Sequence, residues 1–329
     1  MDSPTQQKIR ANWIDVARVL AIILIVIAHI KYLDTGFTSA FGELCWYMQF
    51  DGRVYFFMMI AGYFTRTNAS LGRLGNRFFG LLIPFIIWNT LCATFLHQSF
   101  SFDLFWGTPS NPLPADIPLW FLRDILVCTL LVPFFQKIKL YWPPIILLLF
   151  ILQYQWPQIS HYILLPSPSS VGFFLLGLFL SSFSLHKLKE YWAPYSCLFL
   201  TGGVLIGLYY GCTHGFNWEN LYTPISTFER LFGIMMLISA AILIEQHFPK
   251  VTQFLLKLTP GCFFVFASHY FVYIMFKSHL SHDWLSNYAL LVPFMVMIIC
   301  WGAFYGIRMF LPFLLPIIAH EKTYKLFKN

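Results

Sequence analysis

The feature that most constrains this chain is a series of long apolar stretches, which recur from Val16 almost to the end with short polar segments between them. A helix needs about 20 consecutive, mostly apolar residues to cross the hydrocarbon core of a bilayer. The sequence therefore predicts an all-α, polytopic membrane protein. We place about ten transmembrane helices at residues 16–33, 46–64, 78–96, 118–136, 142–156, 170–184, 193–212, 228–246, 260–277 and 288–308.

The composition excludes an ordinary soluble protein. Only 11% of the 329 residues are charged, whereas soluble domains carry about 25%. The first apolar stretch is too long for a signal-peptide core and lacks a small-residue cleavage site, so we predict a retained helix. We expect one integral-membrane domain over residues 1–329, without an appended soluble domain. The seven cysteines have no metal-binding spacing, so no metal site is predicted.

The basic residues between the apolar stretches are unevenly distributed over alternate polar segments. If the N-terminus is cytoplasmic, fifteen of the 21 Lys and Arg residues fall on the cytoplasmic side, among them Arg73 and Arg77 in a predicted inner loop. Only Lys31 and Lys277 fall on the opposite side. Cytoplasmic loops carry an excess of Lys and Arg. The distribution therefore supports ten spans with both termini in the cytoplasm.

Four further arginines lie in, or at the edge of, predicted spans. A charge at the centre of a membrane helix costs about 2.5 to 3.5 kcal/mol on insertion scales, so these residues are candidates for function. The alternative is that each forms a structural ion pair with a nearby carboxylate. The possible pairs are Arg18 with Asp15, Arg53 with Asp51, Arg123 with Asp124, and Arg230 with Glu229.

The first predicted span places Arg18 and His29 on nearly the same face of a helix. The eleven steps between them correspond to three turns plus about 20°, and to about 16 Å along the axis. We expect both side chains to line a common cavity, with Asp15 one turn away from Arg18 and able to orient it. A guanidinium suits a phosphate group, and a histidine can take a proton from a hydroxyl near neutral pH. The alternative is that the two residues merely lie at the two membrane interfaces.

Six segments resemble the motifs of one known family, in the same order. They are "IDVARVLAIILIVIAH" (14–29), "VYFFMMIAGYF" (54–64), "NRFFGLLIPF" (76–85), "LWFLRDILV" (119–127), "VGFFLLG" (171–177) and "FFVFASHYFVY" (263–273). These segments are similar to acyltransferase family 3, the bacterial integral-membrane O-acyltransferases, over nearly the whole chain. Two positions depart from the family pattern: Ala61 stands where serine is usual, and Pro118 stands where many relatives have histidine.

The resemblance implies transfer of an acyl group, usually acetyl from acetyl-CoA, to a hydroxyl of an envelope carbohydrate at the bacterial plasma membrane. The implied partners are an acyl-CoA donor, a carbohydrate or lipid-linked glycan acceptor and the lipid bilayer, without nucleic acid or a permanently bound cofactor. We expect Arg18, Arg73 and Arg77 to bind the CoA phosphates. His29 would act as general base on the acceptor hydroxyl, with a covalent acyl-histidine as the alternative route.

Four more residues are candidate substrate-binding groups. Arg53 and Arg123 could stabilise an oxyanion or bind substrate. Trp120 could stack on a sugar ring, and its alternative role is that of an interfacial anchor. His269 matches a histidine of the family's ninth-helix motif, and its alternative role is that of a packed, hydrogen-bonded core residue.

The competing functional class is a transporter or flippase of a lipid-linked saccharide, in which buried charges would form a permeation path. The sequence shows no inverted repeat and no paired broken helices, which counts against that class. A membrane protein without activity would leave the buried arginines unexplained. The acceptor could be an exopolysaccharide, an O-antigen or a lipid-linked sugar, and the acyl group could be acetyl or succinyl.

Overall fold

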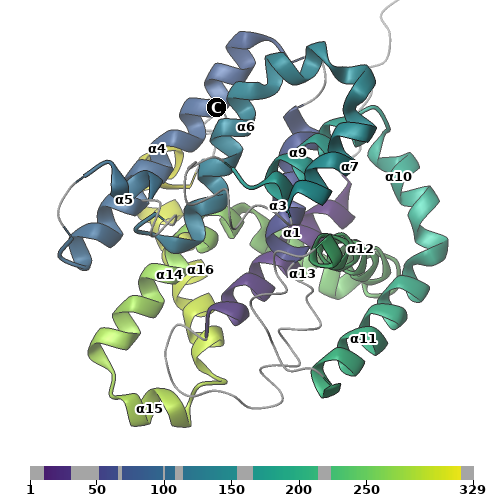
Figure 1. Ribbon diagram of the computed structural model, residues 1–329. Coiled ribbons are helices and arrows are strands. Elements are labelled where there is room, and N and C mark those ends of the chain that lie inside the picture. The colour runs from purple at the N-terminus through teal and green to yellow at the C-terminus, as the bar shows by residue number, and fades with distance from the viewer. Residues whose placement is uncertain are drawn as a thin grey trace, which may run out of the picture.

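The chain forms a helical bundle in a computed structural model that describes residues 11–30, 52–65, 69–98, 101–107, 114–153, 166–213 and 224–319 (Figure 1). These ranges contain no strand, which confirms the predicted all-α class. The α-helices are α1 (Asn12–Ala28), α3 (Gly52–Thr65), α4 (Leu71–Phe95), α5 (Asp103–Trp106), α6 (Trp120–Lys137), α7 (Trp142–Leu152), α9 (Pro168–Leu180), α10 (Leu185–Trp192), α11 (Ser196–Thr213), α12 (Pro224–His247), α13 (Pro249–Leu258), α14 (Cys262–His279), α15 (His282–Asn287), α16 (Val292–Phe310) and α17 (Leu315–Ile318).

Within the described ranges, five helical segments are long and apolar enough to cross a membrane. They match the third, fourth, eighth, ninth and tenth predicted spans: Leu71–Phe95, Ile117–Lys137, Glu229–His247, Pro249–His279 and Val292–Phe310. Helix α9 passes the same test only together with Leu185–Ile206, from which it is bent by 103°. The ten-span count, the single domain and the cytoplasmic termini stay predictions. Residues 31–33, 46–51 and 154–156 of the predicted spans lie outside the described residues.

Helix α1 lies at the centre of the bundle, against α3, α12, α13, α14 and α16 (Figure 1). From residue 19 to residue 28 its sequence is apolar on every side, as is typical of a helix that is buried all round. Val16, Val19, Ile25 and Val26 have no exposed surface. The polar residues that α1 does carry, near its two ends, are therefore held on a rigid central element.

Helix α4 begins at Leu71, so the prediction that Arg73 and Arg77 lie in a loop is wrong. The hydroxyl of Ser70 accepts a hydrogen bond from the backbone N–H of Arg73 at 3.4 Å. Such a cap satisfies one of the backbone donors that have no partner inside the helix. Arg73 and Arg77 therefore lie in the first two turns of α4, one helical turn apart and on one side of it.

A second predicted loop, around Lys250 and Lys257, is helix α13. Thr252 and Leu255 are buried on its inner side, whereas Lys250, Phe254 and Lys257 are exposed. The pattern is that of a surface helix with one apolar side. The cytoplasmic side predicted for these lysines is therefore formed in part by a helix that continues, through one 3-10 turn, into α14.

Helices α3 and α9 approach each other closely through two glycines. A Cβ atom added to Gly62 would overlap the backbone carbonyl oxygen of Phe174, and one added to Gly177 would overlap that of Met59. Small residues at helix contacts in membranes let the two backbones approach in this way. This contact holds the cavity-lining end of α3 in place.

We expect Gly177→Ala to destabilise the folded chain by at least about 1 to 3 kcal/mol, the usual effect of overpacking, because the added methyl group meets a backbone atom. Gly202→Ala on α11 is the matched control, since no atom lies within 4 Å of a Cβ built there. It should be neutral or slightly stabilising, because alanine favours the helix over glycine by about 1 kcal/mol. Thermal unfolding in detergent micelles measures both, and equal midpoints for the two variants would contradict the prediction.

Candidate active site

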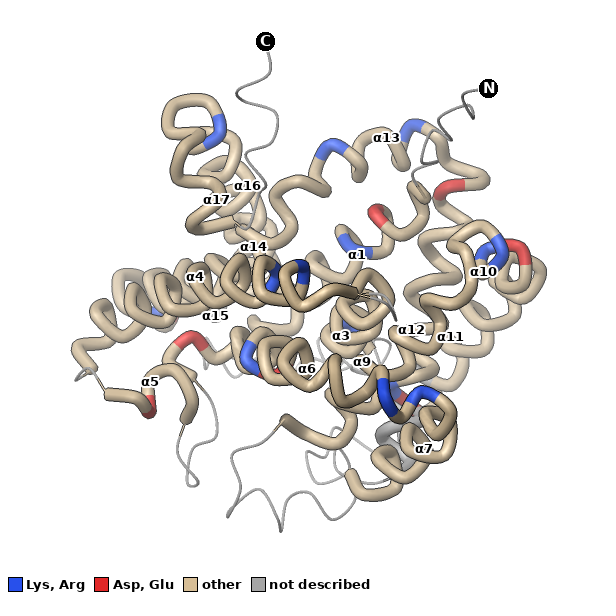
Figure 2. The backbone as a smooth tube through the Cα atoms, turned by 90° about the horizontal axis from the view of Figure 1, so that it is seen from above, with Lys and Arg blue, Asp and Glu red and all other residues tan. Residues whose placement is uncertain are grey.

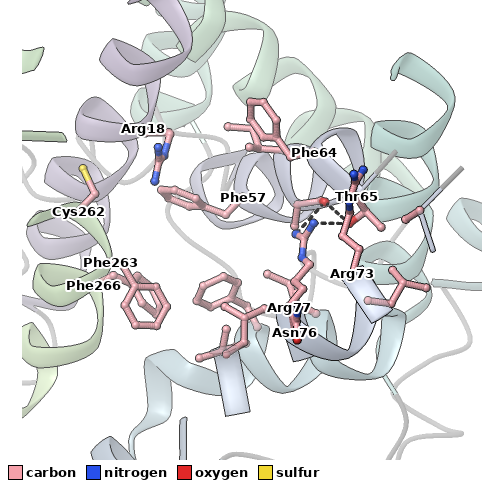
Figure 3. Close-up of a pocket in the computed structure, with 18 of the residues that line it drawn as sticks. Arg18, Phe57, Phe64, Thr65, Arg73, Asn76, Arg77, Cys262, Phe263 and Phe266 are labelled. Atoms are coloured by element: carbon pink, nitrogen blue, oxygen red, sulfur yellow. Dashed lines mark hydrogen bonds between the residues drawn. The ribbon is translucent and has the colours of Figure 1, made fainter. Parts of the chain in front are cut away.

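A cavity of about 670 Å³ opens between α1, α3, α4, α6 and α14 (Figure 3). Its walls are mostly aromatic and aliphatic side chains, which include Phe57, Phe64, Phe121, Phe263 and Phe266. The polar side chains of its lining are Arg18, Thr65, Arg73, Asn76 and Arg77. The pocket thus combines apolar walls with a few polar groups, as is common for sites that bind small molecules.

Arg18 extends from α1 into this cavity and forms an ion pair with Asp15. Its Nη1 lies 3.3 Å from Oδ1 of Asp15, one helical turn away. The side chain of Arg18 keeps 36% of its surface exposed and that of Asp15 only 11%. The expected contact between the two residues is therefore present, and it holds the guanidinium at the cavity without covering it.

Arg77 faces Arg18 from the opposite side of the cavity (Figure 3). Its Nη2 donates to the carbonyl oxygen of Ala61 at 2.9 Å, and its Nη1 donates to the hydroxyl of Thr65. The same hydroxyl donates to the carbonyl of Ala61 at 2.7 Å. The guanidinium is thus fixed against the C-terminal end of α3, where it satisfies the carbonyl oxygen of Ala61 near the helix end.

The cavity has a positive electrostatic character. Arg18, Arg73 and Arg77 line it, and none of the described residues that line it is Asp or Glu. Figure 2 shows the basic segments of α1 and of the start of α4 in blue. The N-terminus of α4 adds the partial positive charge of its backbone N–H groups. This arrangement favours an anionic ligand.

His29 lies at the other end of α1, where it is the C-cap residue. It is not among the residues that line the cavity, and Ile25 and Val26, which precede it on α1, have no exposed surface. The described residues therefore do not form the single cavity that was expected to hold both Arg18 and His29. The half-buried ring of His29 instead packs against α14.

His269 of α14 is fully buried and lies edge-on to His29, with 4.8 Å between the ring centroids. Its Nε2 is 3.4 Å from Nδ1 of His29. Each ring also faces the backbone of its own helix: Nδ1 of His29 is 2.7 Å from the carbonyl oxygen of Ile25, and Nδ1 of His269 is 2.6 Å from that of Phe266. The fold thus joins two predicted site residues that are 240 positions apart.

Arg123 is paired with Asp124, so the contact that the structural alternative predicts is present. Its Nε and Nη2 lie 3.3 Å and 3.2 Å from Oδ1 of Asp124. Its Nη1 donates to the carbonyl oxygen of Trp106 at 2.7 Å. These contacts tie α5 to α6. A role of Arg123 toward substrate stays a prediction.

The other two arginines of the predicted spans are buried as well. Arg53 on α3 is 4% exposed, and its suggested partner Asp51 lies outside the described residues. Arg230 on α12 is 3% exposed, and its guanidinium carbon lies 4.6 Å from the centre of the Tyr55 ring. Its Nη1 lies 3.3 Å from the hydroxyl of Ser169.

Trp120 begins α6 and is half-buried, with its ring centre 6.2 Å from that of Tyr55. Tyr55 therefore contacts both Trp120 and Arg230 and links α3, α6 and α12. The sequence did not single out Tyr55 or Ser169. No signal in the linear sequence marks them, because their contacts depend on helices far apart in the chain.

Comparison with known proteins finds matches over most of the chain. A family model described as an acyltransferase domain matches residues 11–308. The succinoglycan biosynthesis protein ExoH of Rhizobium meliloti (strain 1021) is 26% identical, over 94% of this chain and 92% of that protein. No solved structure matches the chain.

Proposed function

Since the chain belongs to acyltransferase family 3, whose domain matches residues 11–308, we propose that it transfers an acetyl group from acetyl-CoA to a hydroxyl of an envelope polysaccharide. One observation carries the donor part of this proposal: the cavity is lined by three arginines and, among its described lining residues, by no carboxylate. Charge-assisted hydrogen bonds from guanidinium groups are strong and suit phosphate oxygens.

In this proposal, the cavity holds the CoA part of the donor. Arg18 and Arg77 approach the phosphates from opposite walls, and Arg73 contributes from the more exposed rim. Asp15 keeps Arg18 oriented, as its 3.3 Å contact suggests. The phenylalanines of the wall provide apolar surface for the adenine ring and for the pantetheine arm.

In this proposal the pantetheine arm extends beyond the described lining of the cavity, which does not include His29. The acyl group would then meet the acceptor near His29, about 16 Å from Arg18 along α1 by the rise of the helix. His29 takes the proton of the acceptor hydroxyl as the oxygen attacks the thioester carbon. A C–O bond forms, the C–S bond breaks, and the CoA thiolate leaves with the proton from His29. General-base assistance of this kind is worth about 10² to 10⁴ in rate. Arg53, Trp120 and Arg123 stay candidate groups for the acceptor or the oxyanion.

The acceptor class rests on the relative rather than on the geometry. ExoH of Rhizobium meliloti is named for the biosynthesis of succinoglycan, so we propose a polysaccharide or its lipid-linked precursor as the acceptor of this chain. With the termini in the cytoplasm of a bacterium, as the distribution of basic residues predicts, the arginine cavity would open toward the cytoplasmic donor and His29 toward the outer half of the plasma membrane.

The function is tested by mass spectrometry of the envelope glycans of a producing strain, with and without this chain. We expect one class of glycan to lose a single acyl mass in its absence. Membrane vesicles that contain the chain should restore that mass only when acetyl-CoA is supplied. Restored glycan transport without acylation, and without a need for acetyl-CoA, would instead indicate the flippase function.

A further inference from the structure

His269 differs from an ordinary packed histidine, because both nitrogens of its buried ring face polar atoms. Nδ1 lies 2.6 Å from the carbonyl oxygen of Phe266 and 3.2 Å from that of Val265, one turn back on its own helix. Nε2 lies 3.4 Å from Nδ1 of His29. The ring thus connects the backbone of α14 with the side chain that is expected to do the chemistry.

The partners of the two rings determine where their protons lie. A carbonyl oxygen only accepts hydrogen bonds, so Nδ1 of His269 must carry the proton, and its Nε2 then carries the lone pair. Nδ1 of His29 also faces a carbonyl oxygen, that of Ile25, at 2.7 Å. It therefore carries a proton too, which is directed at both the Ile25 oxygen and Nε2 of His269. The lone pair of neutral His29 is consequently on its Nε2.

We propose that His269 is a positioning residue that keeps His29 in its Nδ1–H tautomer and stabilises the imidazolium that forms during acyl transfer. This inference rests on the proposed function and assigns His269 a contact with the base rather than with the substrate. Its complete burial agrees with that role, since the ring has no exposed surface with which to contact a sugar.

The role of His269 can be explained by the path of the proton during acyl transfer. When the acceptor O–H bond breaks, the proton moves to Nε2 of His29, and the ring becomes positively charged. Both of its N–H groups are then donors, and the Nδ1–H group donates to Nε2 of His269 and to the Ile25 oxygen. The contact of 3.4 Å is long for a hydrogen bond, but such contacts often shorten only when substrate is bound. The proton leaves His29 with the CoA thiolate, and His269 stays neutral throughout.

Several other polar or titratable groups lie near His29 or on the helices packed against α1. The ring of Tyr270 lies 6.5 Å from that of His29, and the hydroxyl of Tyr273 donates to the carbonyl of Val26 at 2.8 Å. Charged or titratable groups on the other helices packed against α1 include Arg53 on α3, Glu229 and Arg230 on α12, Lys257 on α13 and Cys300 on α16. All of these groups except Tyr273 are unchanged in the variants described next.

Two substitutions at position 269 distinguish a hydrogen-bond acceptor for His29 from a side chain that only packs. Glutamine at position 269 can place its amide oxygen near the position of Nε2, whereas asparagine is too short and ends near the position of Nδ1. We expect His269→Asn to lower kcat by about tenfold to a hundredfold, the range for loss of a hydrogen bond to a charged group, with an unchanged KM for acetyl-CoA. His269→Gln should recover most of the rate. Tyr273→Phe, which removes a contact between α1 and α14 but no acceptor, should act like the parent chain.

A second measurement needs neither substrate. Diethylpyrocarbonate reacts with a histidine ring in its neutral form and not in its protonated form, so the extent of His29 labelling against pH, read by mass spectrometry, reports when His29 loses its proton. Without the hydrogen-bond acceptor at position 269, the imidazolium form of His29 is less stable. We therefore expect the midpoint of His29 labelling to fall by about one pH unit in His269→Asn and to stay near the parental value in His269→Gln. An unchanged midpoint in His269→Asn, or an equal fall in Tyr273→Phe, would overturn the proposal.

Nitrogen-15 NMR of the histidine-labelled parent chain completes the test if a variant does not fold. We expect protonated Nδ1 and unprotonated Nε2 on His269, and a proton on Nε2 of His269 would refute the arrangement. Because labelling and NMR require no acyl transfer, they separate the two proposals. A chain that shows the expected midpoint shift but acylates no glycan would keep the histidine contact and lose the proposed function.

Discussion

Acetyl transfer by the His29→Ala variant is expected to be about 10² to 10⁴ times slower than transfer by the parent chain, because the substitution removes the proposed general base. Acetyl-CoA should bind as tightly as before, since His29 is not among the residues that line the arginine cavity. Transfer of a radiolabelled acetyl group to endogenous glycan in membrane vesicles measures the first quantity. Equilibrium binding of the same donor to the purified chain measures the second.

His186→Ala is the matched control for this substitution. His186 lies on the surface helix α10, and its side chain is 74% exposed and paired only loosely with Glu190 at 3.2 Å. Its loss should leave transfer unchanged. Parental rates of transfer in His29→Ala would show that another group takes the proton of the acceptor. A rate loss together with weaker donor binding would show that His29 acts on the donor.

The second large effect is expected at the two arginines that face each other across the cavity. Arg18→Ala and Arg77→Ala should each weaken acetyl-CoA binding by about tenfold to a hundredfold, because each removes a proposed charge-assisted hydrogen bond to a phosphate. Arg77→Lys should be intermediate, since lysine keeps the charge but lacks the planar fork that reaches both Ala61 and Thr65. Kd values from equilibrium binding in detergent test all three.

A shortened donor provides the control for this prediction. S-acetylpantetheine lacks the nucleotide phosphates and should bind more weakly than acetyl-CoA. Its Kd should be nearly the same in Arg77→Ala and in the parent chain. Lys250→Ala on the exposed side of α13 is a control for the loss of one surface charge. If Arg18→Ala and Arg77→Ala bind acetyl-CoA with the parental Kd, the cavity is not the donor site.

The class of fold and several of its elements follow from the sequence because they depend on local properties. Runs of apolar residues such as those in α4, α6 and α16 are long enough to predict helices directly, whatever their neighbours. Asp15 and Arg18 are one turn apart, so their contact is also local. The pairing of Arg123 with Asp124 could be stated as an alternative for the same reason.

Other features depend on contacts that no local pattern records. The sequence predicts a span that begins at residue 78, whereas α4 begins at Leu71. The hydroxyl of Ser70 caps the helix there, although glycines and arginines follow it. The i, i+4 spacing of Arg73 and Arg77 was a usable signal that both lie on one side of a helix. The contact between His29 and His269, by contrast, is set by how α14 packs against α1. Helical periodicity cannot predict the phase of that packing.

The rigidity of α1 has a consequence for the choice of donor. Its buried, mostly β-branched and aliphatic side chains fix the separation of the backbone positions of Arg18 and His29. If the phosphates are held near Arg18 and the thioester reacts near His29, this fixed separation selects donors by the length of the arm between their phosphates and their thioester. The size of the acyl group would matter less, because it lies beyond the measured distance.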